Sequence, residues 1–343
     1  MRTMQPLKIL ALEFKSLGDT VLMIPALRAL RDQFEGCALH VLVKEEAAPI
    51  LRPLPWLTRV WTMPRARGRA RVRETWPTLW ALRRERFDRS VDFAGNDRGA
   101  ILSLLCGARQ RLGPICPGGF LGRRFCYTQG VALAPSDQHE TLRLIHVLSG
   151  WAVRRPFRIE IQLQTSPDYE VLAKQILPEP RIICHLGAGR PNRQWLAGHW
   201  AALHKMALSA GHEVLFSTGQ ALRERALFEE VRKSAPEAQA LPPMPDLGLF
   251  LAVLKRARVV ISGDTGPMHF AAGLGVPTIA LFGPSSAVQW GPVGEGHHVL
   301  FGSSCVCQPE SHSCHSANPC LAAISPEQVM RCLQGLSVRG VAQ

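Results

Sequence analysis

The chain of 343 residues lacks several features that would place it in other classes of protein. No uninterrupted apolar run approaches the roughly 18 residues that a membrane-spanning helix needs. The first residues, up to Phe14, carry Lys8 and Glu13 among apolar side chains, and no cleavage site of small residues follows. We therefore expect a first core strand there and no signal peptide. A cytoplasmic protein whose ten cysteines stay mostly reduced is the expectation that follows.

Three short motifs are also missing. The sequence has no GxxxxGK[ST] loop and no GxGxxG after its first apolar run, so ATPases and dinucleotide oxidoreductases lack their expected phosphate fingerprints here. It has no Asp-x-Asp pair that would hold a catalytic divalent ion. We expect an enzyme that needs no cofactor, in which positive side chains and helix dipoles stabilise a leaving group.

The charge of the chain is high and unevenly placed. The formal net charge is +13, with 23 basic against 13 acidic residues in residues 1–150 and 17 against 14 in the remainder. Such a field favours an anionic partner, namely nucleic acid, a phosphorylated saccharide or an anionic membrane surface. A solvated basic face is the plainer alternative.

Arginine alternates with small residues in one dense run, residues 65–73, and Trp56, Trp61, Trp76 and Trp80 lie near it in the sequence. Aromatic side chains interleaved with arginine suit nucleic acid and a layer of lipid headgroups equally. Because no signature of a nucleic-acid-binding domain accompanies the run, we prefer a membrane surface or an anionic glycan and expect no nucleic acid.

The order of strands and helices predicts two domains. A length of 343 residues exceeds what a single core usually supports, and apolar residues make up 46%. Short apolar runs, typical of parallel strands buried on both faces, alternate with helical patterns and then restart. These runs are residues 7–14, 38–43 and 89–93, then 181–185, 213–217, 258–262 and 278–282. We expect an α/β protein of two doubly wound, Rossmann-like domains, residues 1–165 and 166–343, facing each other across a cleft.

Loops that follow these strands hold the candidate chemistry, because ligands of open parallel sheets bind at the carboxyl ends of the strands. In the first loop, Gly18 allows close backbone approach, and Asp19 is either a helix N-cap or a group that accepts a proton. In another loop, Gly187 and Gly189 precede Arg193. Backbone donors together with a guanidinium group suit a diphosphate.

The turn Asp264, Thr265, Gly266 joins a buried strand to an apolar helix, with His269 one turn further on. The N-terminus of a helix is a ready site for an anion. Asp264 has the alternative of tying down the turn, and His269 that of a satisfied core histidine. Strand, turn and helix together favour the anion site.

Three stretches, in this order along the chain, carry a resemblance to a known family. Residues 8–30 include Lys-Ser-Leu-Gly-Asp at 15–19 and Pro-Ala-Leu-Arg-Ala-Leu at 25–30. Residues 186–195 read Leu-Gly-Ala-Gly-Arg-Pro-Asn-Arg-Gln-Trp. Residues 264–277 read Asp-Thr-Gly-Pro-Met-His-Phe-Ala-Ala-Gly-Leu-Gly-Val-Pro, followed by Leu-Phe-Gly-Pro at 281–284 and Trp-Gly-Pro-Val-Gly at 290–294. Together they resemble the lipopolysaccharide heptosyltransferases of glycosyltransferase family 9.

The resemblance implies a GT-B fold whose last helix, about residues 326–336, packs back on the N-terminal domain. It implies an inverting glycosyltransferase without a catalytic metal, which moves heptose from ADP-heptose to the anionic inner core of lipopolysaccharide. Such an enzyme would work at the cytoplasmic face of the inner membrane, with a peripheral contact to it.

By the same resemblance, Asp19 is the general base that takes a proton from the acceptor sugar, and Arg193 contacts the donor phosphates. Thr265 and Gly266 contribute backbone N–H groups to the diphosphate, while Asp264 and His269 shape that site. The glycines 187 and 189 belong to the same donor site.

Basic residues of the first domain are the candidates for binding acceptor phosphates, namely Lys15, Arg98, Arg123 and Arg124. The chain also departs from the family pattern. Many members read Asp-Thr-Gly-Leu-Ser-His where this chain has Pro267 and Met268, and a Thr-Asp-Pro stretch is replaced by Ser-Ser-Ala at 285–287. These departures bear on the donor sugar more than on the type of reaction.

One cluster has the composition of a metal site. It consists of Cys305, Cys307, Cys314 and Cys320, with His312 and His315 between them. Zinc sites usually begin with two residues between the first pair of cysteines, and here there is one. A structural metal and free or redox-variable thiols are both open.

Three other functions remain as alternatives. The first is a related transferase that uses another nucleotide sugar and acceptor. The second is a sugar-nucleotide epimerase on the same scaffold, which would not require a basic acceptor domain. The third is a noncatalytic protein that binds an anionic glycan or nucleic acid.

Overall fold

The computed structural model describes residues 6–63, 72–135, 137–154, 158–189, 193–219, 221–244, 246–302 and 320–339. The chain divides into two compact units, Met1–Gln164 and Thr165–Gln343, beside the domain boundary expected from the sequence. Each is described by itself, and a cleft between them stays a prediction. Among the described helices, none has the length and apolar character needed to cross a membrane.

The first unit is built on a six-stranded parallel sheet with the order β3-β2-β1-β4-β5-β6. The strands are β1 (Lys8–Glu13), β2 (Ala38–Lys44), β3 (Arg59–Met63), β4 (Arg89–Asp92), β5 (Gln110–Ile115) and β6 (Gln129–Ala132). In register, Leu12 of β1 lies beside Leu42 on one side and Asp92 on the other. The strand order reverses between β1 and β4, so their carboxyl ends form a switch point, where ligands bind in such sheets.

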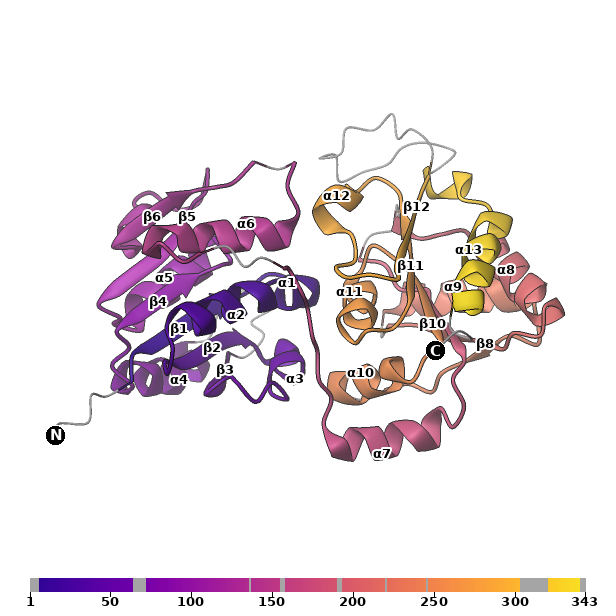
Figure 1. Cartoon of the computed structure of the whole chain (residues 1–343), viewed down its shortest axis with the longest axis horizontal. Helices are drawn as coiled ribbons and strands as arrows, with labels where there is room; N and C mark the ends of the chain where they lie inside the picture. Colours follow the sequence, from indigo (N-terminus) through magenta and orange to yellow (C-terminus); the bar gives the residue numbers. More distant parts are fainter. Residues whose placement is uncertain are drawn as a thin grey trace. The chain divides into compact units, whose positions relative to one another are not determined.

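Helices cover both faces of this sheet (Figure 1). On one face α1 (Leu17–Leu22) and α2 (Ile24–Gln33) contact α6 (Glu140–Val147). On the other, α5 (Asp97–Leu105) contacts both α4 (Val72–Arg84) and the 3-10 turn η2 (Arg123–Cys126). The remaining elements are η1 (Glu45–Ala47), α3 (Ala48–Leu51) and η3 (Leu148–Trp151). Helices on both faces explain why the strands are apolar throughout rather than alternating.

The second unit repeats this topology with the sheet order β12-β11-β10-β7-β8-β9. Its strands are β7 (Ile182–His185), β8 (Val214–Ser217), β9 (Gln239–Ala240), β10 (Val259–Gly263), β11 (Thr278–Phe282) and β12 (His298–Phe301). Its helices are α7 (Pro167–Ile176), α8 (Ala197–Ser209), α9 (Leu222–Ser234), α10 (Leu247–Lys255), α11 (Gly266–Gly273), α12 (Ala287–Trp290) and α13 (Pro326–Arg339), with the 3-10 turn η5 (Cys320–Ala323). The switch point here lies between β7 and β10. The predicted pair of doubly wound α/β domains is thus confirmed.

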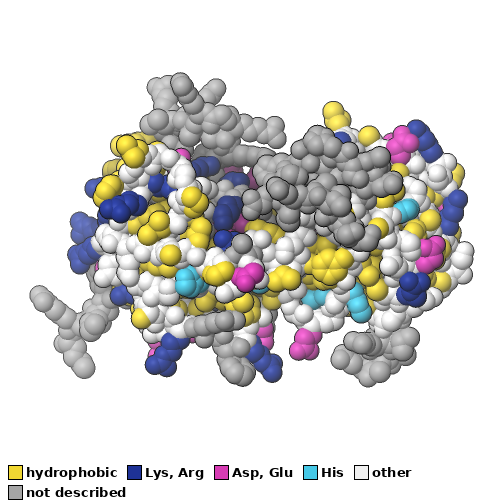
Figure 2. Space-filling model, turned by 90° about the horizontal axis from the view of Figure 1, so that it is seen from above, with side chains coloured by type: hydrophobic (Ala, Val, Ile, Leu, Met, Phe, Trp, Pro, Cys, Tyr) yellow, Lys and Arg dark blue, Asp and Glu magenta, His cyan; other side chains and the backbone are white. Residues whose placement is uncertain are grey.

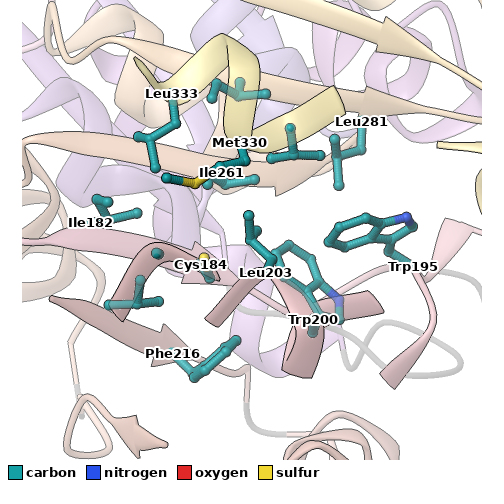
Figure 3. Close-up of a cluster of buried hydrophobic side chains, with 14 of the residues drawn as sticks. Ile182, Cys184, Trp195, Trp200, Leu203, Phe216, Ile261, Leu281, Met330 and Leu333 are labelled. Atoms are coloured by element: carbon teal, nitrogen blue, oxygen red, sulfur yellow. The ribbon is translucent and has the colours of Figure 1, made fainter. Parts of the chain in front are cut away.

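A cluster of large side chains fills the core of the second unit (Figure 3). The rings of Trp195 and Trp200 meet edge to face with centroids 4.7 Å apart. The indole N–H of Trp195 donates to the carbonyl oxygen of Ile324 at 2.9 Å. This bond anchors the segment that follows β7 to the segment that leads into α13.

The last helix, α13, packs within the second unit. Its buried side chains, among them Met330 and Leu333, belong to the core cluster of the second unit, where the helix contacts α8 and β11. The packing of this helix on the N-terminal domain, which the sequence analysis expects, stays a prediction. An amphipathic pattern shows that one face of a helix is buried but does not identify the surface that covers it.

Candidate functional site

The turn after β10 has the geometry expected of an anion site. Strand β10 ends at Gly263, and α11 begins at Gly266 after the extended residue Thr265. Within the described residues, the Thr265 side chain caps no backbone N–H of the helix. Its hydroxyl lies 3.1 Å from the Ser262 hydroxyl instead. The first turn of α11 therefore relies on no hydroxyl cap, and an anion can bind its N–H groups.

An ion pair joins this turn to the loop after β7. The guanidinium Nη1 of Arg193 lies 2.8 Å from Oδ2 of Asp264. Asp264 is buried, whereas the Arg193 side chain keeps 30% of its surface exposed. The two segments approach closely, because a Cβ atom added at Gly263 would lie 3.2 Å from the Arg193 carbonyl oxygen. Asp264 thus orients an arginine that still has N–H groups to offer a ligand.

Buried polar groups surround the neighbouring strand ends. His185, the last residue of β7, pairs through Nδ1 with the Ser217 hydroxyl at the end of β8, at 3.1 Å. Burial lowers the pKa of His185 to about 4, so the ring is neutral at physiological pH. Glu224, in the first turn of α9, accepts a hydrogen bond from the backbone N–H of Gly219 at 2.7 Å. A Cβ atom at Gly187 would lie 2.4 Å from His185 Nε2, so this position requires glycine.

Glu224 is a candidate that the sequence analysis missed. In dinucleotide-binding domains an acidic residue after the second strand binds the ribose hydroxyls, and Glu224 follows β8, the second strand of this unit. It is 8% exposed. The sequence does contain a signal for this residue, because Gly219 follows a predicted strand and precedes an acidic residue. Of the other predicted residues, His269 is buried in α11, and Gly189 has open space around the position of an added Cβ among the described atoms.

In the first unit Asp19 lies in the turn after β1. It occupies the third position of α1 and forms a capping box with Ser16. Its Oδ2 accepts from the Ser16 backbone N–H at 2.9 Å and from the Ser16 hydroxyl at 2.6 Å. Asp19 is 7% exposed. The N-cap is thus Ser16 and not Asp19, and the capping box fixes the Asp19 carboxylate at the carboxyl end of β1.

Two further carboxyl groups lie beside this turn, and the sequence analysis missed both. Glu13 ends β1 and Asp92 ends β4, and both are buried. Glu13 Oε1 accepts from the Lys15 backbone N–H at 2.6 Å, while Oε2 has no partner among the described residues. Burial raises the pKa of Glu13 to about 8. Asp92 accepts from the Tyr127 hydroxyl at 2.6 Å, and burial raises its pKa to about 6.

The predicted acceptor contacts fall into two groups. Lys15 lies next to the Asp19 turn, 3.4 Å from the buried carboxylate of Glu140, and Arg98 is in the first turn of α5, after β4. These two belong to the switch point of the first sheet. Arg123 and Arg124 lie on η2, where Arg123 pairs with Asp97 at 3.2 Å and Arg124 is exposed.

The predicted metal cluster falls mostly outside the described residues. Cys305, Cys307 and Cys314 lie in residues 303–319, and only Cys320 is described, as a buried thiol. Among the residues with described positions, no group of three or more His, Cys, Asp or Glu could hold a metal ion. The cluster stays a prediction.

Two doubly wound parallel sheets in one chain, with Asp19 in the turn after β1 and Asp264 in the turn before α11, are the arrangement expected of the GT-B class. Residues 78–320 match the family described as glycosyltransferase family 9 (heptosyltransferase). The chain belongs to this family and is a glycosyltransferase. Because the chain belongs to this family, it is a transferase and not the epimerase or the noncatalytic binding protein considered as alternatives.

Named relatives agree with this assignment. Lipopolysaccharide heptosyltransferase 1 of Pseudomonas aeruginosa is 28% identical over 315 residues, which cover 88% of this chain and 86% of the relative. Lipopolysaccharide heptosyltransferase 2 of Escherichia coli is 22% identical over 324 residues, covering 86% and 88%.

Solved structures share the fold. A family 9 glycosyl transferase from Veillonella parvula superposes with a TM-score of 0.81 at 20% identity, with 97% of each chain covered. The ADP-heptose lipopolysaccharide heptosyltransferase II of E. coli gives a TM-score of 0.79 at 20% identity, with 98% of this chain and 100% of that chain covered. The predicted GT-B architecture is confirmed.

Proposed function

We propose that this enzyme transfers heptose from ADP-heptose to the inner core of lipopolysaccharide, with inversion and without a catalytic metal. The observation that carries the proposal is the Arg193–Asp264 pair at 2.8 Å, placed at the start of α11. Support for the donor comes from the relatives, since the E. coli protein of similar fold is an ADP-heptose lipopolysaccharide heptosyltransferase.

The donor is held by its diphosphate and its ribose. Arg193 offers N–H groups to phosphate oxygens, and the backbone N–H groups of Thr265 and Gly266 bind the same diphosphate. Glu224 accepts hydrogen bonds from the ribose hydroxyls, which fits its place after β8. His269 and the glycines 187 and 189 shape the walls of this site. A neutral His185 adds no positive charge there.

The reaction divides between the two domains. Asp19 accepts the proton of an acceptor hydroxyl as its oxygen forms a bond to the anomeric carbon of the donor. The bond from that carbon to the phosphate oxygen breaks, and its electron pair leaves with ADP. Arg193 and the N-terminus of α11 stabilise the charge that develops on the departing phosphate. These fixed positive groups take the place of a divalent ion.

The departures from the family pattern point to a second candidate, transfer from a different nucleotide sugar. Met268 is fully buried against Ala280 and Phe282, so its side chain is part of the core and does not select a sugar. Pro267 is partly exposed, and the buried hydroxyl of Ser285 has no partner within the described residues. Ser285 thus has an open hydrogen bond that a sugar hydroxyl can fill.

The acceptor side of the proposal rests on basic residues of the first unit. Lys15 and Arg98, at the switch point of the first sheet, are the proposed contacts to core phosphates, and Arg123 and Arg124 lie further along on η2. A lipid-anchored acceptor implies work at the cytoplasmic face of the inner membrane, with a peripheral contact to it.

A donor and acceptor panel tests the function. The protein is incubated with ADP-heptose, and separately with other ADP-, UDP- and GDP-sugars, in the presence of core acceptors of increasing length. We expect transfer from ADP-heptose to one truncated inner-core acceptor. Turnover of another donor, with none of ADP-heptose, would replace this proposal by the second candidate.

Asp19→Asn tests the base. The amide keeps the shape of the cap but cannot take a proton, so kcat should fall roughly 1,000-fold while donor affinity changes little. Asp246→Asn is the matched control, because Asp246 caps α10 through Gly248 and Leu249 in the second unit. A variant at Asp19 that keeps the wild-type rate would remove it from the mechanism.

A further inference from the structure

One layer of the first unit has apolar side chains on both of its sides. The layer consists of α4, α5 and η2, which lie side by side on one face of the sheet. Its inner side is ordinary core, with Leu82 of α4 and Leu102 of α5 packed on Leu10 and Leu12 of β1. What distinguishes the layer is its outer side.

Helix α5 turns three large apolar side chains outward. Ile101, Leu104 and Leu105 are 44%, 44% and 41% exposed. Their spacing of three and four residues places them on one stripe of the helix. A helix that covers a sheet normally carries polar residues on this stripe, and here none of the three is polar.

Neighbouring elements continue this stripe. Phe125 of η2 is 69% exposed, and Leu121, the residue before the N-cap of η2, is fully exposed. On α4, Trp80 is 54% exposed, and Arg83 of the same helix donates to the Leu105 carbonyl oxygen at 3.3 Å. We name these side chains the α5 surface. Its members are Trp80, Ile101, Leu104, Leu105, Leu121 and Phe125.

Arginines border the α5 surface. Arg84 stacks on Trp80 with its guanidinium carbon 4.1 Å from the ring centroid, and Arg124 stacks on Phe125 at 4.8 Å. Arg109, shortly after α5, is exposed. The carboxylate of Asp97 is already paired with Arg123.

The surrounding unit is basic as well, with 26 basic and 14 acidic residues in residues 1–164 against 14 and 13 in the rest. On the face seen in Figure 2, Lys and Arg side chains lie among hydrophobic ones over the first unit. The α5 surface thus sits in a field that attracts anions.

We infer that the α5 surface docks on a bilayer that contains anionic phospholipids. Apolar and aromatic side chains enter the boundary between headgroups and acyl chains, while the arginines remain at the level of the phosphates. A second copy of the chain fits less well, because it would bring two arginine borders together. The inference assigns a surface to the peripheral membrane contact of the proposed function. It rests on that function only for the identity of the membrane in the cell, because binding to vesicles needs neither donor nor acceptor.

Flotation of the full chain with vesicles tests the inference. Wild-type protein should float with vesicles of phosphatidylglycerol and phosphatidylcholine and remain behind with phosphatidylcholine alone. Leu121→Ser combined with Phe125→Ser should lower binding to the anionic vesicles by more than about tenfold, because each removes a largely exposed apolar group. The matched control is Val171→Ser with Leu222→Ser in the second unit, whose side chains are 64% and 82% exposed.

A charge variant tests the arginine border separately. Arg84→Glu with Arg109→Glu should lower binding by about tenfold or more, and 0.5 M salt should weaken the wild type similarly. Arg225→Glu with Arg232→Glu, exposed on α9, is the control and should bind like the wild type.

Three outcomes would overturn the inference. The first is wild-type protein that does not float with anionic vesicles. The second is wild-type binding both by Leu121→Ser with Phe125→Ser and by Arg84→Glu with Arg109→Glu. The third is a wild-type protein that is a dimer and a Leu121→Ser, Phe125→Ser variant that is a monomer but floats with the vesicles as the wild type does. Transfer to a truncated, lipid-free acceptor is measured on the same samples, and absence of transfer in every sample would count against the proposed function alone.

Discussion

The two units share one strand order, yet their switch points carry opposite chemistry. In the first unit, β1 and β4 end in Glu13 and Asp92, and Asp19 follows in the next turn. In the second, Arg193 follows β7, and Asp264 follows β10 just ahead of α11. The topology places a site at the same edge of both sheets, and the side chains at the strand ends decide what the site can do.

The charged groups at each switch point do not follow the net charge of the unit that carries them. The first unit has nearly all of the net positive charge but gathers carboxyl groups at its switch point, whereas the second is close to neutral and presents a guanidinium group and a helix N-terminus. Burial makes Glu13 and Asp92 weaker acids, with pKa values raised to about 8 and about 6. The second site holds fixed charge. In the proposed mechanism, the first switch point accepts a proton and the second binds the departing diphosphate.

Within the second unit, the largest effect is expected at its switch point. Arg193→Ala removes the guanidinium group that faces the departing phosphate and leaves Asp264 buried without its partner. Because loss of one such donor typically costs ~10²-fold or more, we expect kcat to fall about 100-fold and the KM for the donor to rise. Steady-state kinetics with varied donor measures both.

Arg181→Ala provides the matched control for Arg193, since Arg181 lies ahead of the same strand, β7, and pairs with Glu213 at 2.6 Å. It should leave kcat unchanged. Equal losses in the two variants would mean that the effect is one of stability, and the contrast between the switch points would fail.

A smaller effect is expected at the ribose position. Glu224→Gln keeps the size of the side chain but weakens an acceptor of two hydroxyl hydrogen bonds, so the Kd for ADP should rise about tenfold with little change in kcat. Isothermal titration with ADP measures this, with the exposed Glu213→Gln as control. An unchanged Kd would remove Glu224 from the donor site.

The buried acid of the first unit should appear in the pH dependence of stability. In the unfolded chain Glu13 ionises near its ordinary pKa of 4.5, and in the folded chain near 8. Between these values the folded state holds a proton that the unfolded state has lost, so the free energy of unfolding falls as pH rises from about 4.5 to 8. Glu13→Gln removes this loss, which the two pKa values put at ~5 kcal/mol, or ~10 °C in Tm.

The measurement compares thermal unfolding at pH 5 and pH 8.5 for the wild type and Glu13→Gln, and the wild type should lose more. Glu85→Gln is the control. The hydrogen bond from Lys8 lowers the pKa of Glu85, so removing this carboxylate should change the pH dependence of stability only at lower pH. Parallel curves for the wild type and Glu13→Gln would contradict the assignment of a neutral acid at this strand end.

The smallest expected effect is that of a chelator. If positive groups alone stabilise the departing ADP, EDTA should leave the transfer rate within experimental error. A strong loss that Mg²⁺ or Mn²⁺ restores would contradict a metal-free mechanism. Loss that only Zn²⁺ restores, together with a lower Tm, would point to the cysteine cluster of residues 305–320.

Much of the fold could be predicted because its central strands are buried on both faces and read as continuous apolar runs. The runs that became β1, β2, β7, β10 and β11 were recognised this way. β5 escaped notice because Gly113 and Pro114 interrupt it, and β6 because it is a largely exposed edge strand. Both weaken the pattern on which a sequence-based assignment depends.

The site was predicted in part. Residues at glycine-containing turns were found because strand, turn and helix N-terminus form a local pattern. Glu13, Asp92 and Glu224 were missed because a carboxylate in a sequence looks solvated, and only long-range packing shows that it is buried. The roles assigned to Asp19 and Arg193 remain predictions that the variants above test.

The anchor between Trp195 and Ile324 has a consequence for the whole C-terminal segment. Trp195 lies two residues after Arg193, and its indole is held by the chain that leads into α13. The segment that carries Arg193, the proposed phosphate contact, is therefore tied to the end of the polypeptide. We expect a truncation ahead of Ile324 to abolish transfer, although Asp19, Arg193 and Asp264 all remain in the chain.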